Sequence, residues 1–346
     1  MRLRKPRIAH LPNALPPLDP DPMSPVLNLF ALIGRYGTQG FAISIFMGLA
    51  LPQFAAAARP MLAVTIFVFV TITFARVDAA AMRALLRRPL PLLLASLWLI
   101  AAPIGLTLGL FAVVGRAALD PGLVLGLAVF AASPPIMSAP AVAMLLGLSP
   151  TLLVAAVLAT TSLAPLLSPV VADLVAGAAV PLDLAVLIRR LLLLIGGAVV
   201  AAGLLRWILG EARIRAHKAS FDGLGVVMYF IFAIAAMDGV LAAAVATPWR
   251  VAGFLGLAFA MSIAGFGLSM LLLRTLPMSD RFVLGYATGQ RNMGLLVAAL
   301  GASTPDTTFL FFALAQFPIY MMPQIVKPLA RRLAPQAAPV APAGSP

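Results

Sequence analysis

The chain has 346 residues, of which 62% are hydrophobic and only 10% are charged. This composition excludes a soluble globular domain, in which about a quarter of the residues are charged. The net charge of +13 does not indicate nucleic-acid binding, because the arginines lie in short segments between apolar blocks. The absence of cysteine excludes thiolate metal sites. We therefore expect an integral protein of the lipid bilayer, with no cofactor and no nucleic-acid partner.

Ten apolar blocks follow one another along the chain. Each is about 20 residues long, the length that a helix needs to cross a hydrocarbon core of about 30 Å. We predict ten transmembrane helices, at residues 37–55, 61–75, 90–114, 121–147, 150–177, 184–209, 222–245, 249–273, 281–302 and 306–328. Residues 1–25 and 331–346 are rich in proline and are predicted to be disordered tails. Residues 26–36 are predicted to form a short interfacial helix, and no cleaved signal peptide is expected.

Lysine and arginine gather in every second connection between these blocks. Arg83 and Arg87 follow the second block, Arg213 and Arg215 follow the sixth, and Arg331 follows the tenth. Because cytoplasmic loops carry the excess of basic residues, both chain ends are predicted to be cytoplasmic, in a plasma membrane of the bacterial inner-membrane type. The alternation also favours an even number of spans.

Two of the blocks are interrupted. The fourth contains the sequence SPPIMSAP at 133–140, and the ninth contains TGQRN at 288–292. The blocks that follow them match as well, since Pro165 and Pro169 in the fifth correspond to Pro318 and Pro323 in the tenth. Ten spans divide into two halves of five, and an odd number per half forces the second half to be inverted. We predict two inverted repeats, 26–178 and 179–330; the other interpretation is that proline and glycine are simply common in membrane helices.

Three segments carry a resemblance to a known family: TFARVD at 73–78, LATTSLAPLLSP at 158–169 and GQRNMG at 289–294. With its pattern of spans, the chain resembles the bile acid:sodium symporter family. The resemblance implies an all-α membrane fold in which the broken helices four and nine cross. Helices three to five and eight to ten would form a core, and the others a panel. It also implies an amphipathic organic anion as substrate, a bile-acid-like or other carboxylate or sulfonate, carried in the crevice between core and panel.

Members of that family hold two sodium ions with hydroxyl, amide and carboxylate oxygens on helices four, five and nine. The matching positions of this chain are Ala139, Pro140, Leu153, Val157, Ala287 and Arg291. Sodium, like other hard cations, prefers oxygen ligands, which five apolar side chains and a guanidinium do not supply. A shift of one residue recovers Ser138 but no carboxylate. We therefore expect transport without conventional sodium coupling, and a sodium symporter with a displaced ion site is the alternative.

Arg291 is the most informative single residue of the chain. A charge at this depth costs roughly 2.5–3.5 kcal/mol on insertion scales, so another interaction must offset it. The guanidinium could take the place of a bound cation and hold the carbonyl groups of the broken helices with its five donors. It could instead face the crevice and pair with the carboxylate or sulfonate of the substrate. In a third interpretation it pairs with an acid inside the membrane and helps to fix the fold.

The other candidates for the substrate or crossing site are uncharged polar residues of the same blocks: Gln290, Asn292, Thr288, Ser133, Ser138, Thr160, Thr161 and Gln316. The two threonines of the fifth block either line the crevice or bond back to the carbonyl groups of their own helix. Asp238 is the candidate proton site, because few other carboxylates lie in apolar surroundings. Otherwise Asp238 is a helix-end residue at the membrane interface.

No enzyme is expected, since the sequence contains no paired carboxylates, no histidine motif and no nucleophile constellation. The pattern favours a secondary transporter of an organic anion that works by alternating access. The alternative function is that of a channel or of a non-transporting membrane protein with the same fold. A protein that does not transport would be expected to lose the ion ligands.

Overall fold

The structure is a computed structural model that describes residues 24–35, 37–77, 82–83, 87, 89–177 and 180–333. Among these residues none forms a strand, and seven helices are long and apolar enough to cross a membrane. The chain is therefore an all-α integral membrane protein, as predicted. Most of the two predicted tails lies outside the described residues, although the last helix continues to residue 333.

The helices of the first half begin with α1 at the predicted interfacial segment. They are α1 (Ser24–Arg35), α2 (Gly37–Ala50), α3 (Pro52–Ala58), the 3₁₀ turn η1 (Arg59–Met61), α4 (Leu62–Ala75), α6 (Pro89–Val114), the 3₁₀ turn η2 (Arg116–Ala118), α7 (Pro121–Ala132), α8 (Ala139–Leu145) and α9 (Thr151–Ala176).

The helices of the second half follow α9 in the chain. Its elements are α10 (Leu184–Leu191), the π-helical η4 (Leu192–Gly196), α11 (Gly197–Ala216), α12 (Lys218–Ala236), α13 (Val240–Ala246), α14 (Pro248–Leu272), α15 (Met278–Gly289), α16 (Met293–Leu300), the 3₁₀ turn η5 (Gly301–Ser303), α17 (Asp306–Leu314) and α18 (Gln316–Leu333).

Three of the ten predicted blocks are not among the seven helices that are long enough to cross a membrane. The fourth is divided into α7 and α8 and the ninth into α15 and α16, at the predicted interruptions. The prediction that the first block runs to residue 55 is wrong, because α2 ends at Ala50. Leu51 leaves the helical region (φ −119°, ψ 48°), as expected for a residue that precedes a proline, and Pro52 opens α3.

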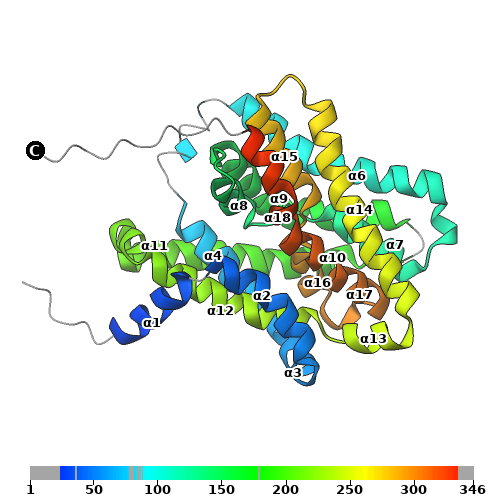
Figure 1. Cartoon of the computed structure of the whole chain (residues 1–346), viewed down its shortest axis with the longest axis horizontal. Coiled ribbons are helices and arrows are strands. Elements are labelled where there is room, and N and C mark those ends of the chain that lie inside the picture. Colours follow the sequence, from blue (N-terminus) through cyan, green and yellow to red (C-terminus); the bar gives the residue numbers. More distant parts are fainter. Residues whose placement is uncertain are drawn as a thin grey trace, which may run out of the picture.

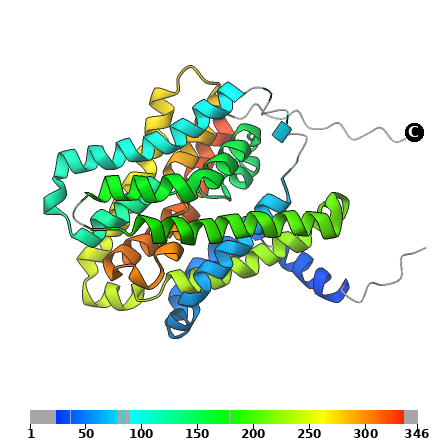
Figure 2. The same ribbon diagram turned by 180° about the vertical axis from the view of Figure 1, so that it is seen from behind.

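The helices pack as two groups, which are visible in both ribbon views (Figures 1 and 2). In the panel group, α1, α2 and α4 pack against α12, and α11 packs against α4. In the core group, α6, α7, α9, α14, α15 and α17 pack against one another, together with α8, α16 and α18. Helix α10 packs on the core group, at α9 and α16, and η4, which follows it, contacts both α9 of the core group and α4 of the panel group.

The broken helices lie at the centre of the core group. Every residue of α7 from 122 to 131 is buried, as is every residue of α15 from 282 to 289. A helix that is buried on all sides is surrounded by other helices. By contrast, α6 exposes large apolar side chains such as Leu90, Leu93 and Leu97, which is the surface expected against lipid.

Candidate functional site

The two interruptions meet and form hydrogen bonds with each other. The N–H of Ile136 donates to the carbonyl oxygen of Gln290 at 2.9 Å, and the N–H of Asn292 donates to that of Pro134 at 2.8 Å. Pro135 and Arg291 thereby face each other as one antiparallel pair. Buried backbone groups that leave a helix need new partners. Here each break supplies the partners of the other.

The local sequence explains why each helix stops at this point. Pro134 and Pro135 have no N–H, so they cannot continue the hydrogen-bond pattern of α7. Ser133 before them is extended (φ −69°, ψ 144°). In the ninth block, Gln290 leaves the helix with φ −111° and ψ 102°. Gly289 permits a close approach, because a Cβ atom there would lie 2.2 Å from the carbonyl oxygen of Ser262 on α14.

Two serines that the sequence interpretation missed support the breaks. Ser168 on α9 donates from Oγ to the carbonyl oxygen of Ala132, the last residue of α7, at 2.7 Å. Ser262 on α14 accepts from Nε2 of Gln290 at 2.5 Å. Both serines are buried in helices that are mostly apolar. A polar residue in such a block is the signal that could have identified them.

The side chain of Arg291 is 3% exposed and lies at the meeting of the breaks. Its Nη2 donates to the carbonyl oxygen of Ser133. Its Nε and Nη1 donate to no atom of the described residues. Arg291 forms no ion pair with the described residues. These residues therefore give no support to the interpretation in which Arg291 pairs with an acid inside the membrane. One nitrogen of the guanidinium thus binds backbone, and the other two have no partner among the described residues.

A cavity between the two groups of helices is lined in part by Arg291. The panel group contributes apolar and aromatic side chains from α4 and α12: Ile66, Phe69, Val70, Tyr229 and Phe232. The core group contributes the two breaks and parts of α16 and α18: Ile136, Met137, Arg291, Asn292, Met293, Gly294, Gln316, Ile319 and Tyr320. The cavity volume is about 40 Å³. That is room for about three water molecules.

The electrostatics of the cavity are simple. Among the described residues that line it, Arg291 is the only one with a charged side chain. Asn292 and Gln316 add amide groups, and Gln316 uses Nε2 on the carbonyl oxygen of Phe312 at 3.0 Å. The other surfaces are apolar or aromatic. An unpaired cation in surroundings of low polarity attracts an anion far more strongly than it would in water.

The remaining predicted residues divide between the breaks and the helix interior. Ser133 bonds from Oγ to the carbonyl oxygen of Val129 at 2.6 Å, and Ser138 lies beside the side chain of Tyr229. Thr160 bonds back to the carbonyl oxygen of Ala156 at 2.7 Å, whereas Thr161 is fully buried and its Oγ1 has no partner among the described residues. None of these four side chains lines the cavity.

Thr288 belongs to a small network inside the core group. Its Oγ1 lies 3.1 Å from Oγ of Ser269 on α14 and 3.2 Å from Nε1 of Trp98 on α6. It also donates to the carbonyl oxygen of Leu284. The side chain therefore joins three helices, and its contacts are structural.

Asp238 lies at the end of α12, away from the cavity. Its Oδ2 pairs with Nη1 of Arg59 at 3.2 Å, and the guanidinium of Arg59 also lies 4.1 Å from the ring centroid of Phe309 on α17. The Asp238 side chain is 20% exposed. These contacts agree with the interpretation of Asp238 as a helix-end residue.

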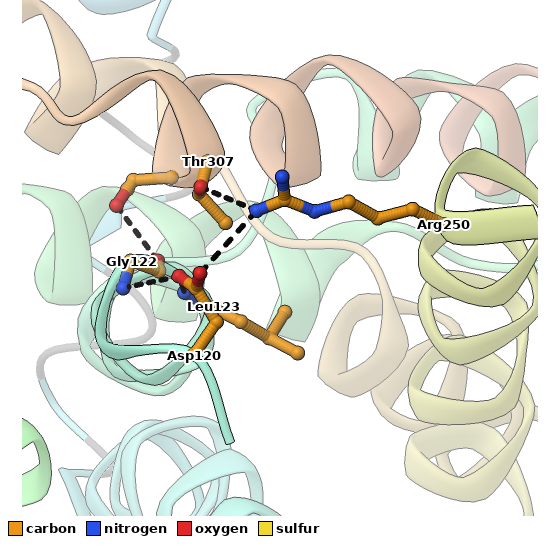
Figure 3. A network of polar contacts seen from close by, with 6 residues as sticks. Asp120, Gly122, Leu123, Arg250 and Thr307 are labelled. Atoms are coloured by element: carbon orange, nitrogen blue, oxygen red, sulfur yellow. Dashed lines mark hydrogen bonds and ion pairs between the residues drawn. The ribbon is translucent and has the colours of Figure 1, made fainter. Parts of the chain in front are cut away.

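A second polar network closes one end of the core group (Figure 3). Asp120 caps α7 by accepting from the N–H groups of Gly122 and Leu123, and Nη2 of Arg250 lies 3.4 Å from its other oxygen. Arg250 also donates to Oγ1 of Thr307 at 2.6 Å. The network fastens the beginnings of α7, α14 and α17 to one another. Because Arg250 and Asp120 are both exposed, we interpret it as a structural clasp.

The chain matches no protein-family model, and no curated protein is significantly similar to it in sequence. Function must therefore be inferred from the site.

Proposed function

We propose that the protein is a secondary transporter that carries an organic anion across the membrane by alternating access. The observation that carries this proposal is Arg291, a buried guanidinium with unpartnered donors at the meeting of two broken helices. Discontinuous membrane helices with exposed backbone groups are typical of transporter binding sites. A buried ionisable residue inside a membrane protein is by default a functional residue.

We extend the seven long helices to ten spans. Helix α2 and the broken pairs α7–α8 and α15–α16 would each cross the membrane as well, with both chain ends in the cytoplasm. The breaks lie five spans apart in chain order, which favours two inverted repeats. This arrangement, with a panel and a core group, supports the resemblance to the bile acid:sodium symporter family. The movement of one group against the other would open the cavity to each side in turn.

The substrate would place its carboxylate or sulfonate on the free donors of Arg291. Arginine suits this task because its planar fork matches two oxygens at once. The apolar remainder of the substrate would lie against Phe69, Phe232 and Tyr320, which line the same cavity. Since the closed cavity is small, an amphipathic anion also requires the two groups to separate.

Transport would not need sodium. Ala139, Leu153, Val157 and Ala287, which stand where the family has ion ligands, are buried among other apolar residues. They offer no side-chain oxygen to a hard cation. The bond from Arg291 to the carbonyl oxygen of Ser133 agrees with a guanidinium that holds the crossing in place of a bound cation.

Counterflow in liposomes tests the proposal. Vesicles loaded with unlabelled benzoate should accumulate labelled benzoate, equally in sodium and in potassium buffers. Arg291→Gln should abolish the accumulation, whereas Arg250→Gln, a change in the exposed clasp, should preserve it. A channel would show conductance without counterflow, and a non-transporting protein would show neither. Accumulation that stops when sodium is replaced by potassium would support a displaced sodium site.

A further inference from the structure

The charges of the side chains that line the cavity lead to a prediction about the mode of transport. Arg291 is the only described residue with a charged side chain that lines the cavity, and two of its three guanidinium nitrogens have no partner among the described residues. We propose that the protein is an obligatory exchanger of organic monoanions, which crosses between its two states only when Arg291 carries an anion. This inference rests on the proposed function and adds its mode of transport.

The first step is the cost of the empty state. A guanidinium stays charged under all conditions in which the protein would work. When the cavity closes without substrate, this charge must leave water, and leaving a buried charge unpaired is strongly destabilising. The cavity, at about 40 Å³, holds only a few water molecules, which do not neutralise the charge. The empty protein should therefore close slowly.

The loaded state does not carry this penalty. A carboxylate or sulfonate on Nη1 or on Nε would pair with the charge and occupy a donor that has no partner among the described residues. The occluded site would then be neutral. The loaded protein should close readily and release its anion on the other side, where it waits for a second anion before it returns.

The same balance selects the charge of the substrate. One monoanion neutralises one arginine, whereas a dianion leaves a negative charge without a partner. A zwitterion would bring a cationic group that needs a carboxylate, and no acidic side chain lies among the described residues that line the cavity. Amino acids and dicarboxylates are thus disfavoured relative to simple carboxylates and sulfonates of similar size.

Proteoliposomes with defined contents test the exchange. Purified full-length protein is reconstituted in sulfate buffer without chloride, so that no other small monoanion is present. One set of vesicles contains unlabelled benzoate and a second contains sulfate alone. The initial uptake of labelled benzoate is measured in both, with valinomycin and potassium to set the membrane potential.

We expect uptake into benzoate-filled vesicles to exceed uptake into sulfate-filled vesicles by about a hundredfold, the rate ratio that corresponds to a buried charge without its partner. This exchange should not respond to membrane potential, because the loaded site is neutral. Equal initial rates in the two sets would overturn the exchange mode while leaving the transporter proposal intact. If neither set accumulates benzoate, the transporter proposal itself is contradicted, and the exchange mode fails with it.

The choice of competitor gives a second, independent readout. Benzenesulfonate inside the vesicles should replace benzoate as the driving anion, whereas phthalate and phenylalanine should not. Vesicles filled with phthalate or phenylalanine that drive uptake as fast as benzoate would contradict the charge balance at Arg291. The Arg250→Gln variant should show the same order of preference as the unmodified protein, since its side chain lies in the exposed clasp.

Discussion

Arg291 and Ser133 are 158 positions apart in the chain, and Nη2 of the arginine donates to the carbonyl oxygen of the serine. The contact joins the end of α7 to the break between α15 and α16. Together with the two backbone hydrogen bonds beside it, this bond holds the broken helices at one point. Nε and Nη1 of the same side chain have no partner among the described residues, so in our proposal one residue both closes the crossing and offers a site for an anion.

Arg291→Met should separate stability from function. Because Arg291→Met removes an unpaired buried charge but also leaves the carbonyl oxygen of Ser133 without its donor, the two effects oppose each other, and we expect the thermal midpoint of the purified protein to change little. Benzoate counterflow should be lost. Thermal unfolding in detergent and liposome assays on the same preparation measure both. A large fall in the midpoint would show that Arg291 acts mainly in the fold.

Gly289→Ala should force α14 and α15 apart. The new Cβ atom would lie 2.2 Å from the carbonyl oxygen of Ser262, a backbone atom that cannot turn away. Overpacking of this kind costs typically about 1–3 kcal/mol, so the free energy of unfolding should fall by at least that amount. Gly256→Ala on α14 is the matched control, because nothing lies within 4 Å of its added atom. Equal stability of the two variants would mean that the contact is looser than described.

Ser168→Ala tests the support of the first break. The carbonyl oxygen of Ala132 would lose its donor, and an unsatisfied buried acceptor costs about 1–3 kcal/mol. Ser96→Ala on α6 removes a buried hydroxyl that has no partner among the described residues, so it should be neutral or slightly stabilising. Denaturation of both variants in the same detergent gives the difference. Ser96→Ala as the more damaging change would refute this assignment.

Asp238→Asn should leave the pH profile of transport unchanged. The carboxylate pairs with Arg59 at a partly exposed position and does not line the cavity. The stability cost should be small, about 0–1 kcal/mol, as for other solvent-accessible ion pairs. Counterflow measured from pH 5.5 to 8.5 in the variant and the unmodified protein decides the question. A displaced profile would restore Asp238 as a proton site.

Much of the fold could be predicted from the sequence, because the bilayer imposes strict rules of length and composition. The two interruptions were identified from Pro134, Pro135 and the run from Gly289 to Asn292, which cannot continue a helix or carry a charge into lipid without a reason. The end of the first span at Ala50 was missed. The helix ends there because Leu51 precedes Pro52, and the continuous apolar sequence around these residues gives no other sign of a helix end.

The site was harder to predict than the fold. Arg291, Asn292 and Gln316 line the cavity, but Thr160 and Thr288 use their hydroxyl groups on neighbours within the helices. Which side of a helix faces the cavity depends on how the helices pack. Because almost all residues of these blocks are apolar, hydrophobic periodicity does not show which side that is. For the same reason the roles of Ser168 and Ser262 became visible only in the structure.

The central claim is that an organic anion binds to Arg291, and the most direct test is to determine what lies beside Nε and Nη1. We would determine the structure of the reconstituted protein with 4-iodobenzoate, whose iodine marks the position of the ligand. We expect the carboxylate within about 3 Å of Nη1 or of Nε and the ring between α4, α12 and α18. A probe bound elsewhere, with Nε and Nη1 on a carboxylate of the protein itself, would contradict the assignment of this crossing as an anion site.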